Sequence, residues 1–289
     1  MSDNTLTKKA STSYVIRTRK STVKQSFISD HGAGIVVNYN DKPVDWLDSD
    51  IAQAGAIQEA PALEDLGKFV VEIGFGGGEV LLALALSRPQ DFFIGIEVYP
   101  TGVARVLKQT KDNNIGNIAL IQHDAVAALN DMFDDEVLDE IRVLFPDPWP
   151  KKRHHKRRLL NADVVNLMVD KLQTGGYLHI ATDWQEYAEE IMQTLTTLYK
   201  VDEDPAASKA GDKAGVSSGE DPAASKAGDK AGVSSDEDRV TSKAEKSPRL
   251  ENCFKGYAPG RQMGRPITKF EARALADGRD IYEFLFVKI

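Results

Sequence analysis

An acidic residue and a cluster of glycines follow the first strongly apolar run of the sequence. Glu72 lies two positions before Gly74, and Gly76 belongs to the same stretch, VEIGFGGGE. A glycine loop between a strand and a helix lets the backbone approach a nucleotide-like ligand closely. However, Glu79 stands at the third glycine position of the dinucleotide fingerprint, and no G-K-[ST] follows as in a Walker loop. Because the acidic Glu72 stands beside the loop, the loop suits a cationic or hydroxyl-rich ligand better than a pyrophosphate.

Three more carboxylates end later apolar runs. Glu97 ends FFIGIEV and could accept both hydroxyls of an adenosine ribose, and Asp124 in IALIQHDA could accept from an adenine amino group. Asp147 follows EIRVLFP and lies between two prolines, which restrict its backbone. Ligands of open α/β sheets bind outside the carboxyl ends of the strands. We therefore expect these side chains to form one constellation.

A basic segment follows Asp147 almost directly. KKRHHKRR, residues 151–158, holds six Lys or Arg and two His in a chain with a formal net charge of −8. Such a run is favourable only against an anionic partner. Trp149, just before it, offers a flat face for stacking on a base. The segment thus predicts a local RNA-binding patch on an otherwise acidic protein.

Two later stretches bring further polar residues to the same predicted edge. HIATDW ends a fifth apolar run with Asp183 and a tryptophan. RPITKFEARALADGRD supplies Thr268, Lys269 and Glu271. The spacing of Thr268 and Glu271 also predicts a capping box that starts a short helix. A capping role does not exclude contact with a substrate.

The elements that must position these residues alternate along the chain. Short apolar runs begin at residues 68, 92, 118, 140 and 176, with helix-like stretches such as residues 78–88, 101–113 and 161–173 between some of them. Buried strands alternating with helices predict an α/β fold with a parallel sheet covered on both faces. The last run, IYEFLFVKI, predicts one more strand.

The chain divides into three kinds of segment. Residues 1–60 are polar and weakly periodic and predict a flexible arm, and residues 61–289 predict one catalytic domain. Within this domain EDPAASKAGDKAGVSS occurs twice with a period of 17, inside a segment, 202–247, with 11 acidic and 7 basic residues. This composition buries too little apolar surface to fold, so a disordered insert is predicted.

Composition excludes several other classes. A single cysteine, Cys253, rules out a disulfide framework and a cysteine-based zinc site. The N-terminal stretch has no apolar segment after its charges, and no window approaches the roughly 20 apolar residues of a membrane span. We therefore expect a cytoplasmic protein without a membrane partner.

These residues resemble the tRNA (guanine-N7-)-methyltransferases of bacterial type, a family of class I S-adenosylmethionine-dependent methyltransferases. The match rests on VEIGFGGGE, GIEVY, QHDA, FPDPWPKKRH, ATDW and RPITKFEAR, in that order. FPDPWPKKRH and TKFE are not general features of Rossmann-like methyltransferases. The resemblance implies a Rossmann-like, mostly parallel seven-stranded sheet with an antiparallel last strand. It also implies methyl transfer from S-adenosylmethionine to N7 of a tRNA guanosine, at variable-loop position 46.

The resemblance further implies roles for individual residues, without a metal or an obligatory protein subunit. The residues expected to bind S-adenosylmethionine are Glu72, Gly74, Gly76, Glu97, Asp124 and Asp147, of which Asp147 is also the expected catalytic residue. The residues expected to bind the substrate are Lys151, Asp183, Thr268, Lys269, Phe270 and Glu271. The residues expected to contact RNA are Arg153, His154, His155, Lys156, Arg157 and Arg158.

Other activities stay open on the residues alone. The nearest is a methyltransferase that acts on another RNA or on a protein. An NAD-dependent oxidoreductase is disfavoured by Glu79 and by the basic run. An RNA-binding protein that has kept the fold without turnover is a third reading, which detection of any methyl transfer would exclude.

Overall fold

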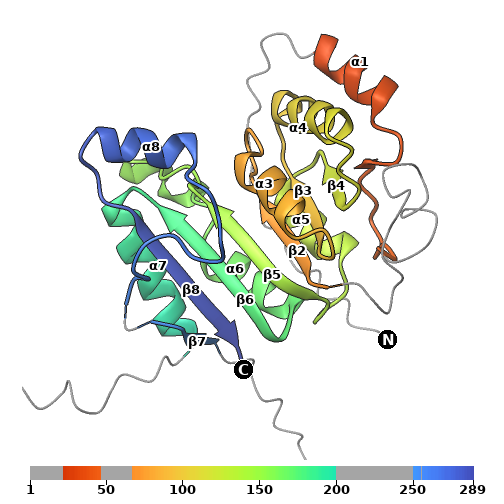
Figure 1. The fold of residues 1–289 in the computed structure, drawn as a ribbon. Coiled ribbons are helices and arrows are strands. Elements are labelled where there is room, and N and C mark those ends of the chain that lie inside the picture. The colour runs from red at the N-terminus through yellow and green to blue at the C-terminus, as the bar shows by residue number, and fades with distance from the viewer. Residues whose placement is uncertain (1–21, 47–66, 200–249, 255) are drawn as a thin grey trace, which may run out of the picture. The chain divides into compact units, whose positions relative to one another are not determined.

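The computed structural model describes residues 22–46, 67–199, 250–254 and 256–289. Within these residues the chain forms one mixed sheet in the order β1-β4-β3-β2-β5-β6-β8-β7 (Figure 1). Strands β1 to β6 pair in parallel, whereas β8 runs antiparallel to β6 and β7 antiparallel to β8. The strands are β1 (Val36–Val37), β2 (Phe69–Ile73), β3 (Phe92–Ile96), β4 (Ile118–Ile121), β5 (Leu138–Leu144), β6 (Leu172–Thr182), β7 (Leu250–Asn252) and β8 (Tyr282–Lys288).

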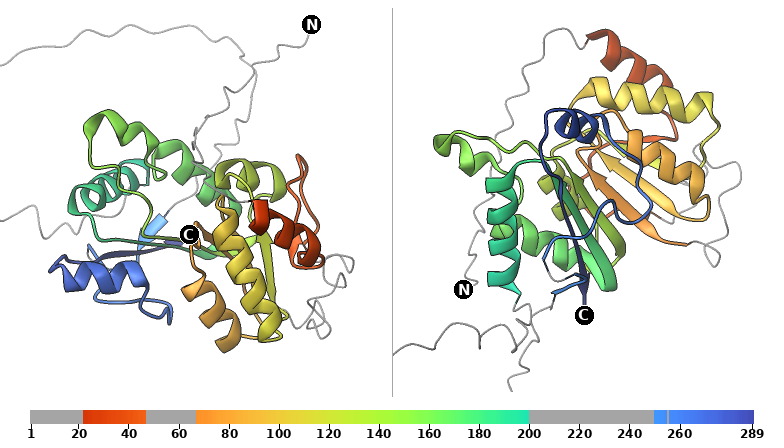
Figure 2. Two further views of the ribbon diagram at one scale, coloured as in Figure 1. Left: turned by 90° about the horizontal axis from the view of Figure 1, so that it is seen from above. Right: turned by 60° about the vertical axis from the view of Figure 1, so that its left-hand side comes forward.

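The helices cover both faces of the sheet, as predicted. α1, α3 and α4 pack on one face and α5, α6 and α7 on the other, and α8 lies on the same side as α3 and α4 (Figure 2). The helices are α1 (Thr22–His31), α3 (Glu79–Ser87), α4 (Pro100–Asp112), α5 (Ala125–Met132), α6 (Ala162–Lys171), α7 (Gln185–Leu198), α8 (Lys269–Ala276) and the 3₁₀ helix η2 (Lys152–Arg157).

The described sheet has one strand more than the seven that were expected. The last strand, β8, is antiparallel as predicted. The short β1 pairs with β4 through Val36 and Val37, inside the segment expected to be a flexible arm. Two residues are too few to carry an alternating hydrophobic pattern, so no sequence signal marks this strand. Ile28 and Trp46 of the same segment are buried against the two cores, so residues 22–46 are part of the fold.

The remaining predicted segments lie partly outside the described residues. Residues 1–21 and 47–60 of the predicted arm and the whole repeat insert, 202–247, are among them. Residues on both sides of the insert belong to one compact unit. No helix among the described residues is both long and apolar enough to cross a membrane.

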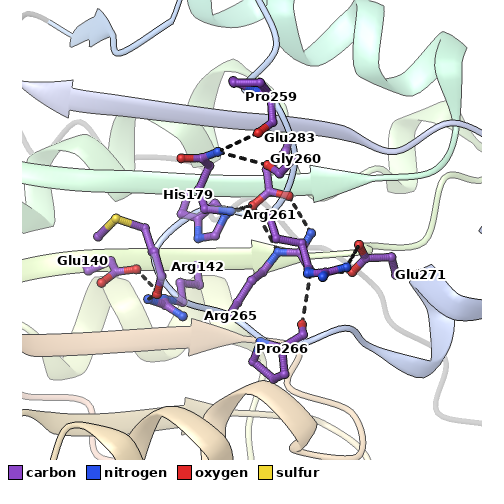
Figure 3. A network of polar contacts seen from close by, with 12 residues as sticks. Glu140, Arg142, His179, Pro259, Gly260, Arg261, Arg265, Pro266, Glu271 and Glu283 are labelled. Carbon is purple, nitrogen blue, oxygen red and sulfur yellow. Dashed lines mark hydrogen bonds and ion pairs between the residues drawn. The ribbon is translucent and has the colours of Figure 1, made fainter.

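One half of one sheet face carries a cluster of buried charged side chains. Side chains of β5, β6 and β8 on the side of α8 form a buried charge layer with residues that precede or begin α8 (Figure 3). The charge layer consists of Glu140, Arg142, His179, Arg265, Glu271 and Glu283, each at most 3% exposed. It occupies the place that an apolar helix face fills on the opposite side of the same strands.

Candidate functional site

A pocket of about 220 Å³ lies at the carboxyl ends of β2, β3, β4 and β5. This is the edge at which open α/β sheets bind their ligands. The predicted site residues that line the pocket are Gly74, Gly76, Glu97, Asp124, Asp147 and Phe270. The structure therefore brings together five of the six residues expected at the cofactor, with one residue expected at the substrate.

The glycine loop leaves open space where side chains would otherwise stand. Gly74 and Gly76 have φ angles of 69° and 54°, which glycine adopts at no steric cost. A Cβ placed on Gly74 would meet nothing within 4 Å, so the space in front of the loop is free for a ligand. Gly102 of α4 backs the loop so closely that its own Cβ would lie 2.4 Å from the Gly76 carbonyl oxygen.

Backbone amides hold two of the strand-end carboxylates in place. Glu97 Oε2 accepts from the Gly76 amide at 2.9 Å, and Oε1 accepts from the Tyr99 amide at 3.0 Å. Asp124 caps α5, because its Oδ1 accepts from the amides of Val126 and Ala127 at 3.0 and 3.1 Å. Both carboxylates thus face the pocket from fixed positions.

Asp147 lies on a strained segment of backbone. Phe145 and Trp149, two positions before and after it, have φ angles of 55° and 44°, which bulky side chains rarely adopt. Such outliers persist only where the surrounding structure enforces them. The Asp147 side chain is exposed and lines the pocket, and partial desolvation raises the pKa of its carboxyl.

Glu72 does not line this pocket, contrary to its expected contact with the cofactor. Its side chain is 4% exposed, and its Oε2 has no hydrogen-bond partner among the described residues. Burial raises the pKa of the carboxyl to about 8, although Arg142 favours the charged form. Glu72 therefore lies beside the charge layer, and its burial favours the protonated form.

The segment at the start of α8 combines structural and exposed residues. Thr268 caps the helix by accepting from the Glu271 amide at 3.1 Å, which confirms the predicted cap. Glu271 is 3% exposed and pairs with Arg265 at 2.5 Å, so its carboxylate contacts the protein interior and not a substrate. Phe270, 47% exposed, reaches the pocket, and Lys269 approaches Glu79 at 3.8 Å.

Asp183 and Lys151 do not line this pocket. Asp183 lies in a separate groove of about 500 Å³, where it forms an ion pair with Arg279. The two cavities share no lining residue. Lys151 is exposed at the start of η2 and lines neither cavity.

The basic run is mostly exposed, with one exception. Lys152, Arg153, Lys156 and Arg157 are exposed, and His154 and His155 are partly buried. Partial desolvation and the neighbouring arginines lower the pKa of His154. The Arg157 guanidinium lies 5.0 Å over the Trp149 ring, so it covers one face that was expected to stack on a base.

The expected RNA contact of Arg158 is wrong. Its side chain is 1% exposed, pairs with Glu190, and donates to the Pro148 carbonyl oxygen at 2.8 Å. This arginine fixes the loop that carries Asp147 to helix α7. The resemblance implies RNA contact for the whole segment, and a run of basic residues does not show which of its side chains is buried.

Sequence reasoning missed several residues around the pocket. Tyr99, His123 and Phe145 line it, and each stands next to or two residues from a predicted carboxylate. The His123 ring stacks on Tyr39 at a centroid distance of 3.8 Å, so the N-terminal segment supports the pocket wall. All three stand inside the motifs GIEVY, QHDA and FPDPWPKKRH, and this was the signal that could have indicated them.

Comparison with known proteins decides the family. Residues 67–231 match a family model described as "Putative methyltransferase". The tRNA (guanine-N(7)-)-methyltransferase of Ralstonia pickettii is 35% identical over 93% of this chain and 81% of its own length. That of Nitrosospira multiformis is 38% identical over 75% of this chain and 73% of its own length.

The chain belongs to the tRNA (guanine-N(7)-)-methyltransferase family. The resemblance noted from the motifs is thereby confirmed, as is the Rossmann-like class I methyltransferase fold. Among solved structures, a 30S ribosomal A1408 methyltransferase from an uncultured bacterium is 16% identical, covers 88% of this chain and 99% of its own, and has a TM-score of 0.44.

Proposed function

We propose that this enzyme transfers the methyl group of S-adenosylmethionine to N7 of a guanosine in tRNA, at variable-loop position 46. The observation that carries the proposal is the pocket at the strand ends, where Glu97, Asp124 and Asp147 meet the open space before Gly74. Two relatives named tRNA (guanine-N(7)-)-methyltransferase are 35% and 38% identical to the chain over 93% and 75% of its length.

The residues of the pocket fit the methyl donor. S-adenosylmethionine supplies an electrophilic methyl group on a cationic sulfonium, which a carboxylate-lined pocket favours. Glu97 would hold the ribose hydroxyls and Asp124 the adenine, because both carboxylates are fixed by backbone amides beside the glycine loop. Phe270, from α8, would cover the bound molecule from the opposite side.

Methylation at N7 does not require the protein to remove a proton before the attack. Guanine N7 exposes a lone pair, so the N7–C bond forms as the S–C bond breaks, and the electron pair of the S–C bond stays on sulfur. Positive charge then moves onto the purine, and a fixed carboxylate nearby stabilises it. Asp147 would therefore orient the base and stabilise this charge instead of removing a proton.

The reaction is tested with labelled S-adenosylmethionine and unmodified tRNA, beside a tRNA whose variable-loop guanosine is changed to adenosine. Label in the first tRNA alone, released by cleavage specific for 7-methylguanosine, is the expected result. Equal label in both would contradict the position. Label on protein, or none on tRNA, would contradict the substrate.

The role of Asp147 is tested by Asp147→Asn, which keeps shape and some hydrogen bonding. Loss of one electrostatic contact to a transition state lowers kcat about 100-fold or more. Near-wild-type turnover with an unchanged pH profile would exclude the electrostatic role.

The exposed part of the basic run would hold the tRNA phosphates. Each phosphate contact adds about 0.7 to the slope of log affinity against log salt for single strands. Arg153→Ala should lower that slope for tRNA and leave S-adenosylmethionine binding unchanged. The matched control is Lys108→Ala on α4, whose side chain is 64% exposed outside the run. Equal effects of both variants would contradict a local patch.

A further inference from the structure

We propose that Arg279 is an internal competitor of guanine. Its guanidinium occupies the carboxylate of Asp183, and the methyl-accepting base must displace it to bind there. The inference rests on the proposed function, because it concerns recognition of the same substrate. It assigns a role to a residue outside the motifs of the family.

The contact itself is direct. Arg279 Nη1 donates to Asp183 Oδ2, and Nη2 donates to Asp277 at 3.0 Å. The Asp183 side chain is 17% exposed and that of Arg279 is 35% exposed. The carboxylate is thus the more enclosed partner, and the guanidinium is the one that can move into solvent.

Guanine and arginine present the same chemical group to a carboxylate. The N1–C2–N2 unit of guanine is a cyclic guanidine, and it offers N1–H and N2–H as neighbouring donors. A guanidinium offers its N–H donors in a fork that matches a carboxylate in the same way. Because both would use the same acceptor oxygens of Asp183, binding of one excludes the other.

The groove around Asp183 favours a base over a phosphate. Four carboxylates line it, and within its lining Arg279 is the sole arginine or lysine side chain. A phosphate would be repelled by this acidic wall, whereas a neutral edge rich in donors is accepted. Its charged lining residues are Asp183, Glu186, Glu189, Arg279 and Asp280, and Trp184 and Tyr282 are its aromatic members.

The backbone holds Arg279 at this place. Its amide donates to the Ala274 carbonyl at 2.8 Å, where the chain leaves α8, and Gly278 makes the turn with a φ of 72°. β8 then begins at Tyr282, which pairs with Thr182 at the end of β6. Arg279 is therefore tethered beside Asp183 whether or not their side chains touch.

The strength of the pair suits an exchangeable competitor. Tethering gives a group an effective concentration in the millimolar range, which favours the occupied state. Partly exposed ion pairs are nevertheless weak, corresponding to a factor of about 2 to 5 in occupancy. The pair can thus lower the apparent affinity for guanosine without closing the site.

The test compares steady-state constants for unmodified tRNA in Arg279→Ala, Arg279→Lys and Arg273→Ala. Arg273→Ala removes an equal charge from an exposed position on the neighbouring helix α8. Arg279→Ala should lower KM about threefold at unchanged kcat, Arg279→Lys should lower it less, and Arg273→Ala should not lower it. An unchanged or raised KM in Arg279→Ala would overturn the proposal.

A chemical probe separates competition from a general charge effect. Guanidinium chloride at concentrations well below denaturation should compete with tRNA more strongly in Arg279→Ala than in the wild type, because the carboxylate is vacant. Sodium chloride at equal ionic strength is the control. Equal inhibition of both proteins would contradict the proposal. Absence of methyl transfer by the wild type would instead contradict the proposed function itself.

Discussion

The two faces of β5, β6 and β8 are built on opposite principles. Toward α6 and α7 these strands present apolar side chains such as Ile141, Leu178 and Phe284, all fully buried. Toward α8 the same strands present charged residues and a histidine, Glu140, Arg142, His179 and Glu283, which are equally buried and stand beside the apolar Ala181 and Leu285. Apolar burial is non-directional, so the apolar face does not by itself fix the exact position of the helix packed on it. Buried charges, in contrast, require specific partners. The charged face therefore fixes the position of one particular segment.

That segment is the approach to α8. Arg265 donates to Glu283 at 2.5 and 3.1 Å and to Glu271 at 2.5 Å (Figure 3). Its guanidinium also lies 5.7 Å from the centre of the Phe145 ring, which lines the pocket. One arginine thus joins the sheet, helix α8 and the loop that carries Asp147. Both faces stabilise the fold, but the charged face also positions the elements of the site.

Arg265→Ala should have the largest effect on stability. It leaves two buried carboxylates, Glu271 and Glu283, without their main partner, and such changes cost about 4 kcal/mol. Urea unfolding at pH 7.5 measures the loss. Arg261→Ala is the control, because Arg261 contacts Glu271 at 3.3 Å but is 46% exposed, and it should lose less than about 1 kcal/mol. Equal losses would show that the buried position does not matter.

Leu178→Ala, on the apolar face, should lower the free energy of unfolding by a smaller amount. Leu178 of β6 is fully buried in the core under the helices. Truncation of a core leucine to alanine lowers the free energy of unfolding by about 3 kcal/mol. The loss should not depend on pH, unlike that of Arg265→Ala, which should shrink in acid as the stranded carboxylates are protonated. Leu275→Ala, at a side chain 50% exposed on α8, is the control. A pH-dependent loss of stability in Leu178→Ala would contradict the proposed difference between the charged and the apolar face.

Glu72→Gln should change how stability depends on pH. The folded-state pKa of Glu72, about 8, lies above its ordinary value of 4.5. The folded protein then binds more protons than the unfolded chain between these values, so its stability falls as pH rises from 4.5 to 8. Glutamine cannot ionise, so the variant should gain stability relative to wild type over that range. Parallel stability curves would mean that Glu72 ionises normally.

Lys269→Ala should have the smallest effect on stability. The pair with Glu79 spans 3.8 Å, and its lysine is 50% exposed, so the expected change is within about 0.5 kcal/mol. Thermal unfolding at low and high salt measures it. A loss comparable with that of Arg265→Ala would mean that exposed charges contribute as much as the buried layer.

The strand-end carboxylates could be predicted because parallel strands bring their ends to one edge. Glu97, Asp124 and Asp147 needed only that rule. The pair of Asp183 and Arg279 could not be predicted, because the two residues are 96 positions apart and the contact depends on where α8 ends.

Burial of individual charges was equally hard to infer. Arg158 looks like its neighbours in sequence, and only the position of α7 places Glu190 against it. By contrast, the alternation of Glu140 and Arg142 with apolar residues in EIRVL was visible, and it marks a strand with one charged face. The sequence thus predicts which groups reach the edge, but not which of them find partners inside the protein.

The strained backbone on either side of Asp147 has a consequence for protein engineering. Phe145 and Trp149 keep left-handed conformations that disfavour their side chains by about 1 to 3 kcal/mol each. A screen of random variants for heat resistance should therefore enrich glycine substitutions at these two positions, because glycine relieves the strain. Glycine at Phe145 would also remove a side chain that lines the pocket, and glycine at either position would loosen the backbone that holds Asp147, so the most heat-resistant clones should be among the slowest enzymes.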